Sequence, residues 1–169
     1  MPTIAEVDAM DREAFVRTFG SIYEHSPWIA EAAFAKRPFG TLAALQEAMA
    51  AAVRAAPPER QLALIRAHPD LAGRAALAGE VTADSAKEQA SAGLDRLTEE
   101  EHARFHALND AYRAKFGFPF IMAVKGAGKA QIRAGFEARL PNDAATETAT
   151  ALAQIDRIAG FRLAELVEG

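Results

Sequence analysis

Apolar residues recur at helical spacing in segment after segment of this chain, and proline or glycine ends most of these segments. Between residues 41 and 56 the spacings of three and four define one apolar face, made of Leu42, Leu45, Met49, Ala52 and Val53. Thr41 stands where a side chain can cap the first turn. The same reasoning predicts helices near 8–24, 28–36, 58–67, 82–92 and 128–139. The pattern therefore favours an all-α fold.

Two later segments carry this pattern most completely. In "LTEEEHARFHALNDAYRAKFG", Thr98 and Glu101 have the spacing of a capping box, and Gly117 supplies the stop. Its apolar stripe consists of Phe105, Leu108, Tyr112 and Phe116. The final helix, expected over about 144–166, carries Leu152, Ile155, Ala159, Leu163 and Leu166. No connection is long enough to separate domains, so we expect a single-domain helical bundle over residues 1–169.

One segment departs from the helical pattern. "FGFPFIMAVKGAGK" contains a continuous apolar run over 118–124, bounded by glycines and interrupted by Pro119. By pattern alone this run is a short strand. A lone strand among helices has no partner, so side chains, water or a ligand must satisfy its backbone. Two interpretations stay open: an extended segment that lines a ligand site, or a segment that fills the core between two helices.

Composition excludes several classes of function. The chain has 169 residues, half of them hydrophobic, and a net charge of −4 without a basic run, which argues against a nucleic-acid surface. It has no cysteine, so thiolate nucleophiles and thiolate zinc sites are excluded. "MPTIAEVDAM" lacks the pattern of a signal peptide, and no apolar run approaches the roughly 20 residues of a membrane span. We expect a cytoplasmic protein without a membrane segment, whose partner is a small molecule or another protein.

A histidine precedes a proline in "RAHPDLAG". Pro69 disfavours helical geometry at His68, so the helix over 58–67 ends there and holds the imidazole at its C-terminus. The negative end of the helix dipole favours imidazolium, and a histidine that titrates near neutral pH is a natural proton carrier. The alternative is a histidine that only caps the helix.

Polar side chains share one helix face in "TADSAKEQASAGL", where Ser85, Glu88 and Gln89 stand at i, i+3 and i+4. Such a face can bind an amide-rich ligand, with Glu88 available for acid–base work beside an imidazole. Solvated surface is the alternative. Arg162 lies on the apolar stripe of the last helix, seven residues after Ile155. Its guanidinium reaches water, pairs with a carboxylate of the protein or binds an anionic ligand.

Taken together, "AHPDLAG", "SAKEQASAGL", "FGFPFIMAVKG" and "IAGFRL" resemble the 2-oxo-4-hydroxy-4-carboxy-5-ureidoimidazoline (OHCU) decarboxylases, which complete the conversion of urate to (S)-allantoin. The resemblance covers almost the whole chain. It implies an all-α bundle, usually a homodimer, that works without metal or organic cofactor. It also implies catalytic roles for His68 and Glu88. The substrate-binding positions that it implies are Pro69, Ser85, Gln89, Arg162 and the backbone of Phe118, Pro119, Phe120, Ile121 and Met122.

Competing interpretations rest on weaker patterns. His102 and His106 stand at i and i+4 and could share a metal, but Ala103 occupies the place of the glutamate in the zincin motif. "GAGK", which ends at Lys129, lacks the upstream glycine and the following Ser or Thr of a phosphate-binding loop. The remaining alternative is a non-catalytic helical interaction module, which needs an exposed apolar patch.

Overall fold

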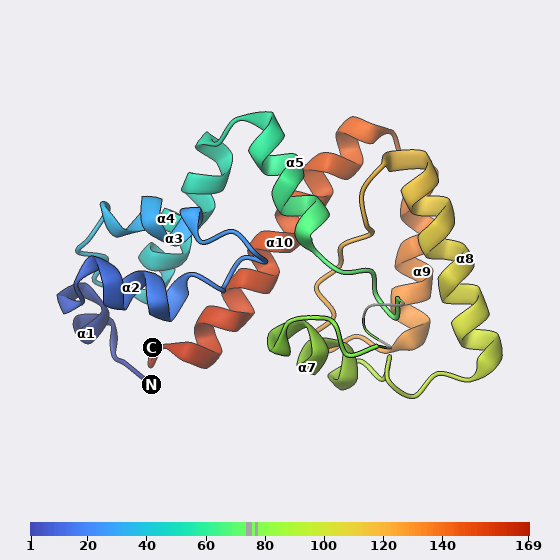
Figure 1. Ribbon diagram of the computed structural model, residues 1–169, viewed down its shortest axis with the longest axis horizontal. Helices are drawn as coiled ribbons and strands as arrows, with labels where there is room; N and C mark the ends of the chain where they lie inside the picture. Colours follow the sequence, from blue (N-terminus) through green and yellow to red (C-terminus); the bar gives the residue numbers. More distant parts are fainter. Residues whose placement is uncertain (74–75, 77) are drawn as a thin grey trace. The chain divides into compact units, whose positions relative to one another are not determined.

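The computed structural model describes residues 1–73, 76 and 78–169. In this part of the chain the elements are helices, joined by short loops (Figure 1). They are α1 (Ile4–Ala9), α2 (Arg12–Phe19), α3 (Trp28–Phe34), α4 (Leu42–Ala55), α5 (Pro58–Ala67), α7 (Ala83–Ser91), α8 (Glu99–Phe116), α9 (Lys129–Arg139) and α10 (Ala144–Leu166). The prediction of an all-α fold is confirmed.

The expected helix over 8–24 is wrong, because two helices occupy its place. Met10 leaves helical geometry with a ψ of 145°, and Asp11 starts α2 by accepting a hydrogen bond from the Ala14 amide at 2.8 Å. A capping aspartate offers the backbone an alternative to continuing the first helix, so the chain stops and restarts there. The other expected helices agree with the structure to within a few residues at each end.

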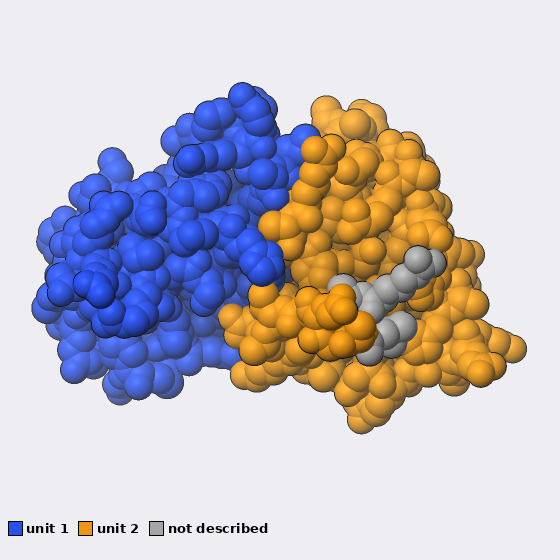
Figure 2. All heavy atoms as spheres, in the orientation of Figure 1, with its two compact units in different colours: residues 1–64, 156–169 blue, residues 65–155 orange. Residues whose placement is uncertain are grey.

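The chain divides into two compact units, coloured separately in Figure 2. The first comprises Met1–Leu64 and Asp156–Gly169, and Phe15 lies in its core. The Phe15 ring packs against three other aromatic rings at centroid distances of 4.9 to 5.9 Å: Phe19, Phe34 and Phe39. The two ends of the chain meet in this unit, where the Glu168 amide donates to the Pro2 carbonyl at 2.9 Å (Figure 1).

The second unit comprises Ile65–Ile155, with α7, α8 and α9. Its core contains Phe120 stacked on Phe136 at a centroid distance of 3.8 Å, and Tyr112 edge-on to Phe120 at 5.4 Å. Whether the chain is one domain, as its short connections predict, stays a prediction. In the described residues, no helix is both long and apolar enough to cross a membrane.

Candidate functional site

His68 lies directly after the last helical residue of α5, as the following proline predicts. Its backbone amide donates to the Ile65 carbonyl at 3.2 Å, and the residue is only 6% exposed. Pro69 is partly buried beside it. His68 is therefore held at the helix end and largely shielded from bulk water.

Side chains from two other helices hold the loop that follows His68. Gln89 of α7 uses both ends of its amide: Oε1 accepts from the Ala72 amide at 2.9 Å, and Nε2 donates to the Asp70 carbonyl at 3.3 Å. From α8, Asn109 Nδ2 donates to the Leu71 carbonyl at 2.9 Å, and Arg113 Nε binds the Asp70 carboxylate at 2.9 Å. These contacts fix the backbone next to His68.

The polar face of α7 is mostly buried. Thr82 caps the helix by accepting from the Ser85 amide at 3.3 Å. Ser85 and Gln89 are 4% and 6% exposed, so solvated surface, the alternative for this face, is wrong for these two residues. Glu88 is partly exposed. Because Gln89 contacts the loop after His68, the structure brings α7 and His68 into one neighbourhood.

The segment over 118–124 lies outside any helix or strand, and its side chains are buried except for Met122, which is partly exposed. Side chains bind its backbone, as the lack of a partner strand requires. Arg139 Nη1 donates to the Ile121 carbonyl at 2.6 Å, and Gln154 Oε1 accepts from the Ala123 amide at 2.9 Å. The segment thus fills the core of the second unit, while its substrate-lining role stays a prediction.

Two contacts connect the His68 region with the neighbourhood of this segment. Arg66, two residues before His68, donates through Nε to the carbonyl of Gly117 at 3.2 Å. Arg113, four residues before Gly117 on α8, binds Asp70 as described above. The predicted site residues from His68 to Met122 therefore all belong to the second unit.

Arg162 belongs to the first unit and is 7% exposed. Its guanidinium donates to the Ile22 carbonyl at 3.0 Å and pairs with the Glu24 carboxylate at 2.9 Å. Of the three possibilities for this charge, namely water, a protein carboxylate or an anionic ligand, the structure shows pairing with a carboxylate of the protein. A buried pair of this kind holds both side chains in place, because separating either from its partner leaves an uncompensated charge.

The two histidines of α8, His102 and His106, are candidates by their spacing for a shared metal site. His102 Nδ1 is buried and has no hydrogen-bond partner among the residues that the structure describes. In the same described residues, no group of three histidine, cysteine or acidic side chains has an arrangement that could hold a metal ion. The pattern at His102 and His106 therefore gains no support from the fold.

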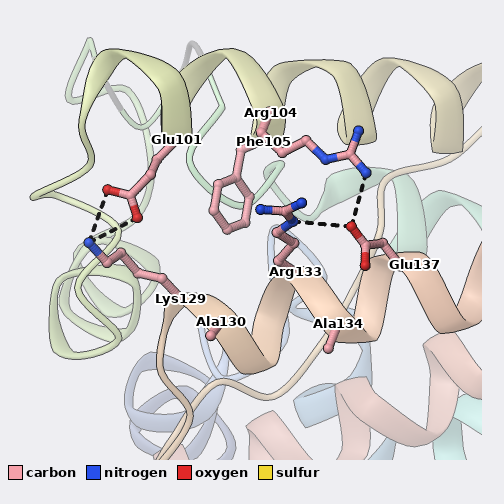
Figure 3. Close-up of a pocket in the computed structure, with 8 residues that line it drawn as sticks. All are labelled: Glu101, Arg104, Phe105, Lys129, Ala130, Arg133, Ala134 and Glu137. Atoms are coloured by element: carbon pink, nitrogen blue, oxygen red, sulfur yellow. Dashed lines mark hydrogen bonds and ion pairs between the residues drawn. The ribbon is translucent and has the colours of Figure 1, made fainter.

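A groove of about 430 Å³ between α8 and α9 contains none of the predicted site residues. Its charges are paired, as Figure 3 shows: Lys129 with Glu101 at 3.0 Å, and Arg104 and Arg133 with Glu137 at 2.9 and 3.1 Å. The hydrogen bond from Arg104 and then that from Arg133 lower the pKa of Glu137. Lys129, the end of "GAGK", is thus bound to a carboxylate.

Comparison with known proteins decides the family. The family model described as OHCU decarboxylase matches residues 8–164, a range that includes every predicted site residue. This chain belongs to the OHCU decarboxylase family. The match extends over both compact units, so the family likeness concerns the whole fold rather than one motif.

Curated relatives of the family match over nearly full length. A protein of Haloferax volcanii named OHCU decarboxylase is 47% identical over 163 residues, covering 96% of this chain and 95% of the relative. A protein of Halalkalicoccus jeotgali with the same name is 45% identical, covering 97% and 91%. The uric acid degradation bifunctional protein PucL of Bacillus subtilis is 44% identical over 99% of this chain but only 33% of its own length.

Two solved structures share the fold of this OHCU decarboxylase family member. A crystal structure of (S)-allantoin synthase aligns with a TM-score of 0.79 at 31% identity, covering 99% of this chain and 54% of that one. A crystal structure of an OHCU decarboxylase in the presence of (S)-allantoin aligns with a TM-score of 0.69 over 93% of this chain and 98% of that one. At 20% identity, the second likeness concerns the fold alone.

Sequence reasoning missed the polar residues that support the site from inside the core. Asn109 follows Phe105 by four residues and therefore stands on the apolar stripe of α8, where it is 3% exposed. Arg139 follows Phe136 by three residues on the buried face of α9. Arg162 stands out because it is a polar residue on an apolar stripe. Asn109 on α8 and Arg139 on α9 show the same pattern and could have been found in the same way.

Proposed function

We propose that this protein decarboxylates 2-oxo-4-hydroxy-4-carboxy-5-ureidoimidazoline to (S)-allantoin and CO2. The observation that carries the proposal is the 47% identity to a relative named for this activity, across 96% of the chain. The buried site residues support it as well, because His68, Ser85 and Gln89 lie in one unit with the segment over 118–124.

The chemistry of this substrate fits a site built only from side chains and backbone. The carboxylate and a hydroxyl share C4, next to the imine carbon C5. When the bond from C4 to the carboxylate breaks, its electron pair forms a C4=C5 double bond, and the imine pair moves onto the ring nitrogen. The ring nitrogen takes up a proton, the hydroxyl loses its proton as C4=O forms, and C5 gains a proton, so that the reaction consumes one proton overall. The substrate is its own electron sink, so the reaction needs no organic cofactor.

His68 and Glu88 handle the protons in this proposal. His68, oriented by Glu88, exchanges the proton of the 4-hydroxyl. The burial of His68 and the hydrogen bonds that fix the loop after it support this role, because they limit the positions of the imidazole relative to a bound ligand. Delivery of a proton to one face of C5 sets the S configuration.

The remaining site residues bind the substrate. Ser85 and Gln89 bind the ureido and ring amides together with the backbone of residues 118–122, while Pro69 lines the site. Gln89 Nε2 has a second N–H beyond the one that contacts Asp70. We also propose that Arg162 binds an anionic or carbonyl oxygen of the ligand in addition to its pair with Glu24, since a guanidinium carries five N–H donors. We further propose that the active protein is a homodimer and that it is cytoplasmic. Sedimentation analysis of the purified chain tests the oligomeric state.

Replacing His68 tests this mechanism. Urate oxidase and 5-hydroxyisourate hydrolase generate the labile substrate in place, and its decay is followed by ultraviolet absorbance. His68→Asn is expected to keep the fold and the melting temperature but to abolish the acceleration of decay. His25→Asn is the matched control, because His25 is exposed and asparagine tolerates its positive φ of 46°. Unchanged turnover in His68→Asn would remove His68 from the mechanism.

The alternative function, a non-catalytic interaction module, gains no support from large exposed side chains in the described part of the chain. Among the residues that the structure describes, Met1 is the only large hydrophobic side chain that is exposed. A helical module that docks onto a partner needs a contiguous apolar patch. Titration with allantoin separates the two functions, because a decarboxylase binds its product and an interaction module does not.

A further inference from the structure

Helix α9 packs one continuous face against the segment over 118–124. Gly135, Phe136 and Arg139 of this face contact the segment, and the buried Ile132 continues the same face one turn earlier. The Phe136 ring stacks on Phe120 at 3.8 Å. A Cβ on Gly135 would stand 3.1 Å from the Met122 sulfur, so the glycine leaves room for this side chain. The segment therefore lies directly on α9.

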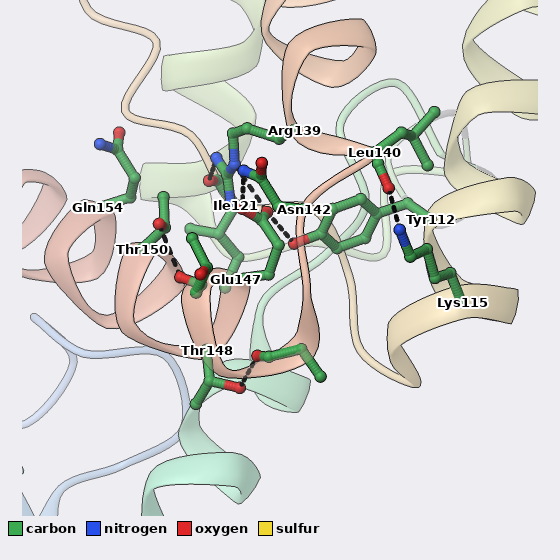
Figure 4. Close-up of polar contacts among 12 residues, drawn as sticks. Tyr112, Lys115, Ile121, Arg139, Leu140, Asn142, Glu147, Thr148, Thr150 and Gln154 are labelled. Carbon is green, nitrogen blue, oxygen red and sulfur yellow. Dashed lines mark hydrogen bonds and ion pairs between the residues drawn. The ribbon is translucent and has the colours of Figure 1, made fainter.

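Arg139 binds the segment at two places. Its Nη1 donates to the Ile121 carbonyl at 2.6 Å, and its guanidinium lies 4.3 Å from the centroid of the Phe120 ring. Nε donates to the Glu147 carboxylate at 2.8 Å (Figure 4). The side chain is only 14% exposed. A planar guanidinium held on both sides in this way is a fixed donor rather than a mobile one.

Glu147 keeps Arg139 in place. Its carboxylate is fully buried and also accepts from Tyr112 Oη at 2.5 Å and from Asn142 Nδ2 at 3.0 Å. Burial, and then the hydrogen bond to Glu147, raise the pKa of the Tyr112 phenol, so it stays protonated and donates. Tyr112 of α8 and Asn142 of the α9–α10 connection thus fix the carboxylate that orients Arg139 (Figure 4).

Gln154 of α10 holds the same stretch of backbone two residues further on. Its Oε1 accepts from the Ala123 amide at 2.9 Å. In extended backbone, the carbonyl of residue i and the amide of residue i+2 point to the same edge. Arg139 and Gln154 therefore bind one edge of the segment, as a partner strand would. No residue in the described part of the chain donates to or accepts from the peptide groups of Phe120 and Met122, which belong to the other edge.

We propose that Arg139 and Gln154 are positioning residues for the decarboxylation: together they fix the backbone of Ile121–Ala123, so that the opposite edge presents its peptide groups to the substrate at a constant spacing. The inference rests on the proposed function, in which the backbone of residues 118–122 binds the ureido and ring amides. Neither side chain needs to touch the substrate for this role.

Loss of either contact has a specific kinetic consequence. A segment that shifts on α9 loses aligned hydrogen bonds to the substrate, so KM rises, and a misplaced substrate also reacts more slowly. A merely structural role has a different result. Partial unfolding reduces the concentration of active enzyme and therefore the apparent kcat, but it leaves the KM of the remaining folded molecules unchanged.

Gln154 is the first residue to vary, because it is uncharged and partly exposed. Gln154→Met removes the acceptor for the Ala123 amide at similar side-chain length, whereas Gln154→Glu keeps an acceptor oxygen. We expect KM to rise roughly tenfold in Gln154→Met and to stay within about twofold of wild type in Gln154→Glu. Thr150→Val is the control on the same helix, because the Thr150 hydroxyl donates to the Thr146 carbonyl within α10 and has no hydrogen bond with the segment in the described residues.

Arg139→Lys tests the second contact with the charge retained. A lysine cannot reach both Glu147 and the Ile121 carbonyl with a planar fork, so KM is expected to rise as in Gln154→Met. Arg133→Lys on α9 is its control, because Arg133 pairs with the exposed Glu137. An active wild type with unchanged KM in both Gln154→Met and Arg139→Lys would overturn this inference alone. An inactive, folded wild type would overturn the proposed function and this inference with it.

Discussion

Among the residues of the second unit with left-handed backbone geometry, two flank the candidate site. Gly117 ends α8 with a φ of 76° just before the segment over 118–124. Ala72 has a φ of 54° in the loop after His68, where Gln89 binds its amide. Glycine adopts this geometry without cost, but alanine does not. A strained alanine next to a catalytic candidate is typical of a loop whose shape serves the site.

Opposite substitutions at Gly117 and Ala72 are expected to change the free energy of unfolding by different amounts. Gly117→Ala should lower the free energy of unfolding by about 1 to 2 kcal/mol, because the exposed methyl group adds strain without burial. Ala72→Gly relieves a similar strain but loses a methyl group that is 1% exposed, worth about 0.8 kcal/mol. Its net change should therefore lie between about zero and a gain of about 1 kcal/mol in the free energy of unfolding. Urea denaturation measures both, and a loss of stability in Ala72→Gly would contradict the assignment of strain.

Asp156 of the first unit is a carboxylate whose ionisation opposes folding. Burial raises its pKa above the ordinary value of 3.8, and the hydrogen bond from Tyr23 Oη at 3.3 Å offsets this only in part. The folded state therefore binds the proton more tightly than the unfolded state. Stability from this group is present at low pH and is lost as the pH rises from 3.8 through the folded-state pKa.

Asp156→Asn is expected to remove this pH dependence. The amide oxygen can still accept from Tyr23, and no charge has to be buried. The variant should unfold at a higher urea concentration than wild type at pH 7 and at the same concentration near pH 3.5. A lower midpoint at pH 7 would mean that the ionised carboxylate stabilises the fold, which is incompatible with a raised pKa of Asp156.

At the scale of elements, helical periodicity predicts almost every helix, because each one buries an apolar stripe. Two features escape it. The break at Met10 depends on Asp11, which caps α2 instead of continuing α1. The free energy of this cap is similar in size to helix propensities, so propensity does not predict which conformation forms. The segment over 118–124 has the composition of a strand, but its partners are Arg139 and Gln154, which come from later helices, and no local pattern specifies them.

The ion pair of Arg139 and Glu147 is expected to contribute strongly to the stability of α9 on its neighbours. Arg139→Met leaves a fully buried carboxylate without its cation, so the free energy of unfolding should fall by about 3 kcal/mol. Arg133→Met on the same helix breaks an exposed pair and should change it by less than about 0.5 kcal/mol. Urea denaturation at pH 7 compares the two, and equal effects would contradict a special role for the buried pair.

At the scale of the whole molecule, each compact unit contains an arginine–glutamate pair that is largely shielded from solvent and joins two structural elements. Arg162 pairs with Glu24 in the first unit, with side chains 6% and 1% exposed, and Arg139 pairs with Glu147 in the second. The sequence could place Arg162 on an apolar stripe but could not choose between a protein carboxylate and a ligand. That choice depends on a residue 138 positions away, beyond the reach of periodicity.

The sequence names candidate site residues, whose roles stay a prediction, but not the contacts that hold them in place. His68 stands out because a proline follows it, and Ser85, Glu88 and Gln89 because they share a face; their family likeness then names their roles. The hydrogen bonds from Asn109, Arg113 and Gln89 to the loop after His68 require the three-dimensional fold, since they join α7 and α8 to the end of α5.

The central claim is that this chain decarboxylates OHCU with control of configuration at C5. Circular dichroism of the product tests it most directly, with urate oxidase and 5-hydroxyisourate hydrolase generating the substrate in the presence and absence of the protein. Spontaneous decay yields a racemate. We expect the protein to produce a rapid, optically active (S)-allantoin signal. Slow racemic decay at the rate of the protein-free control, with the protein folded, would contradict the account.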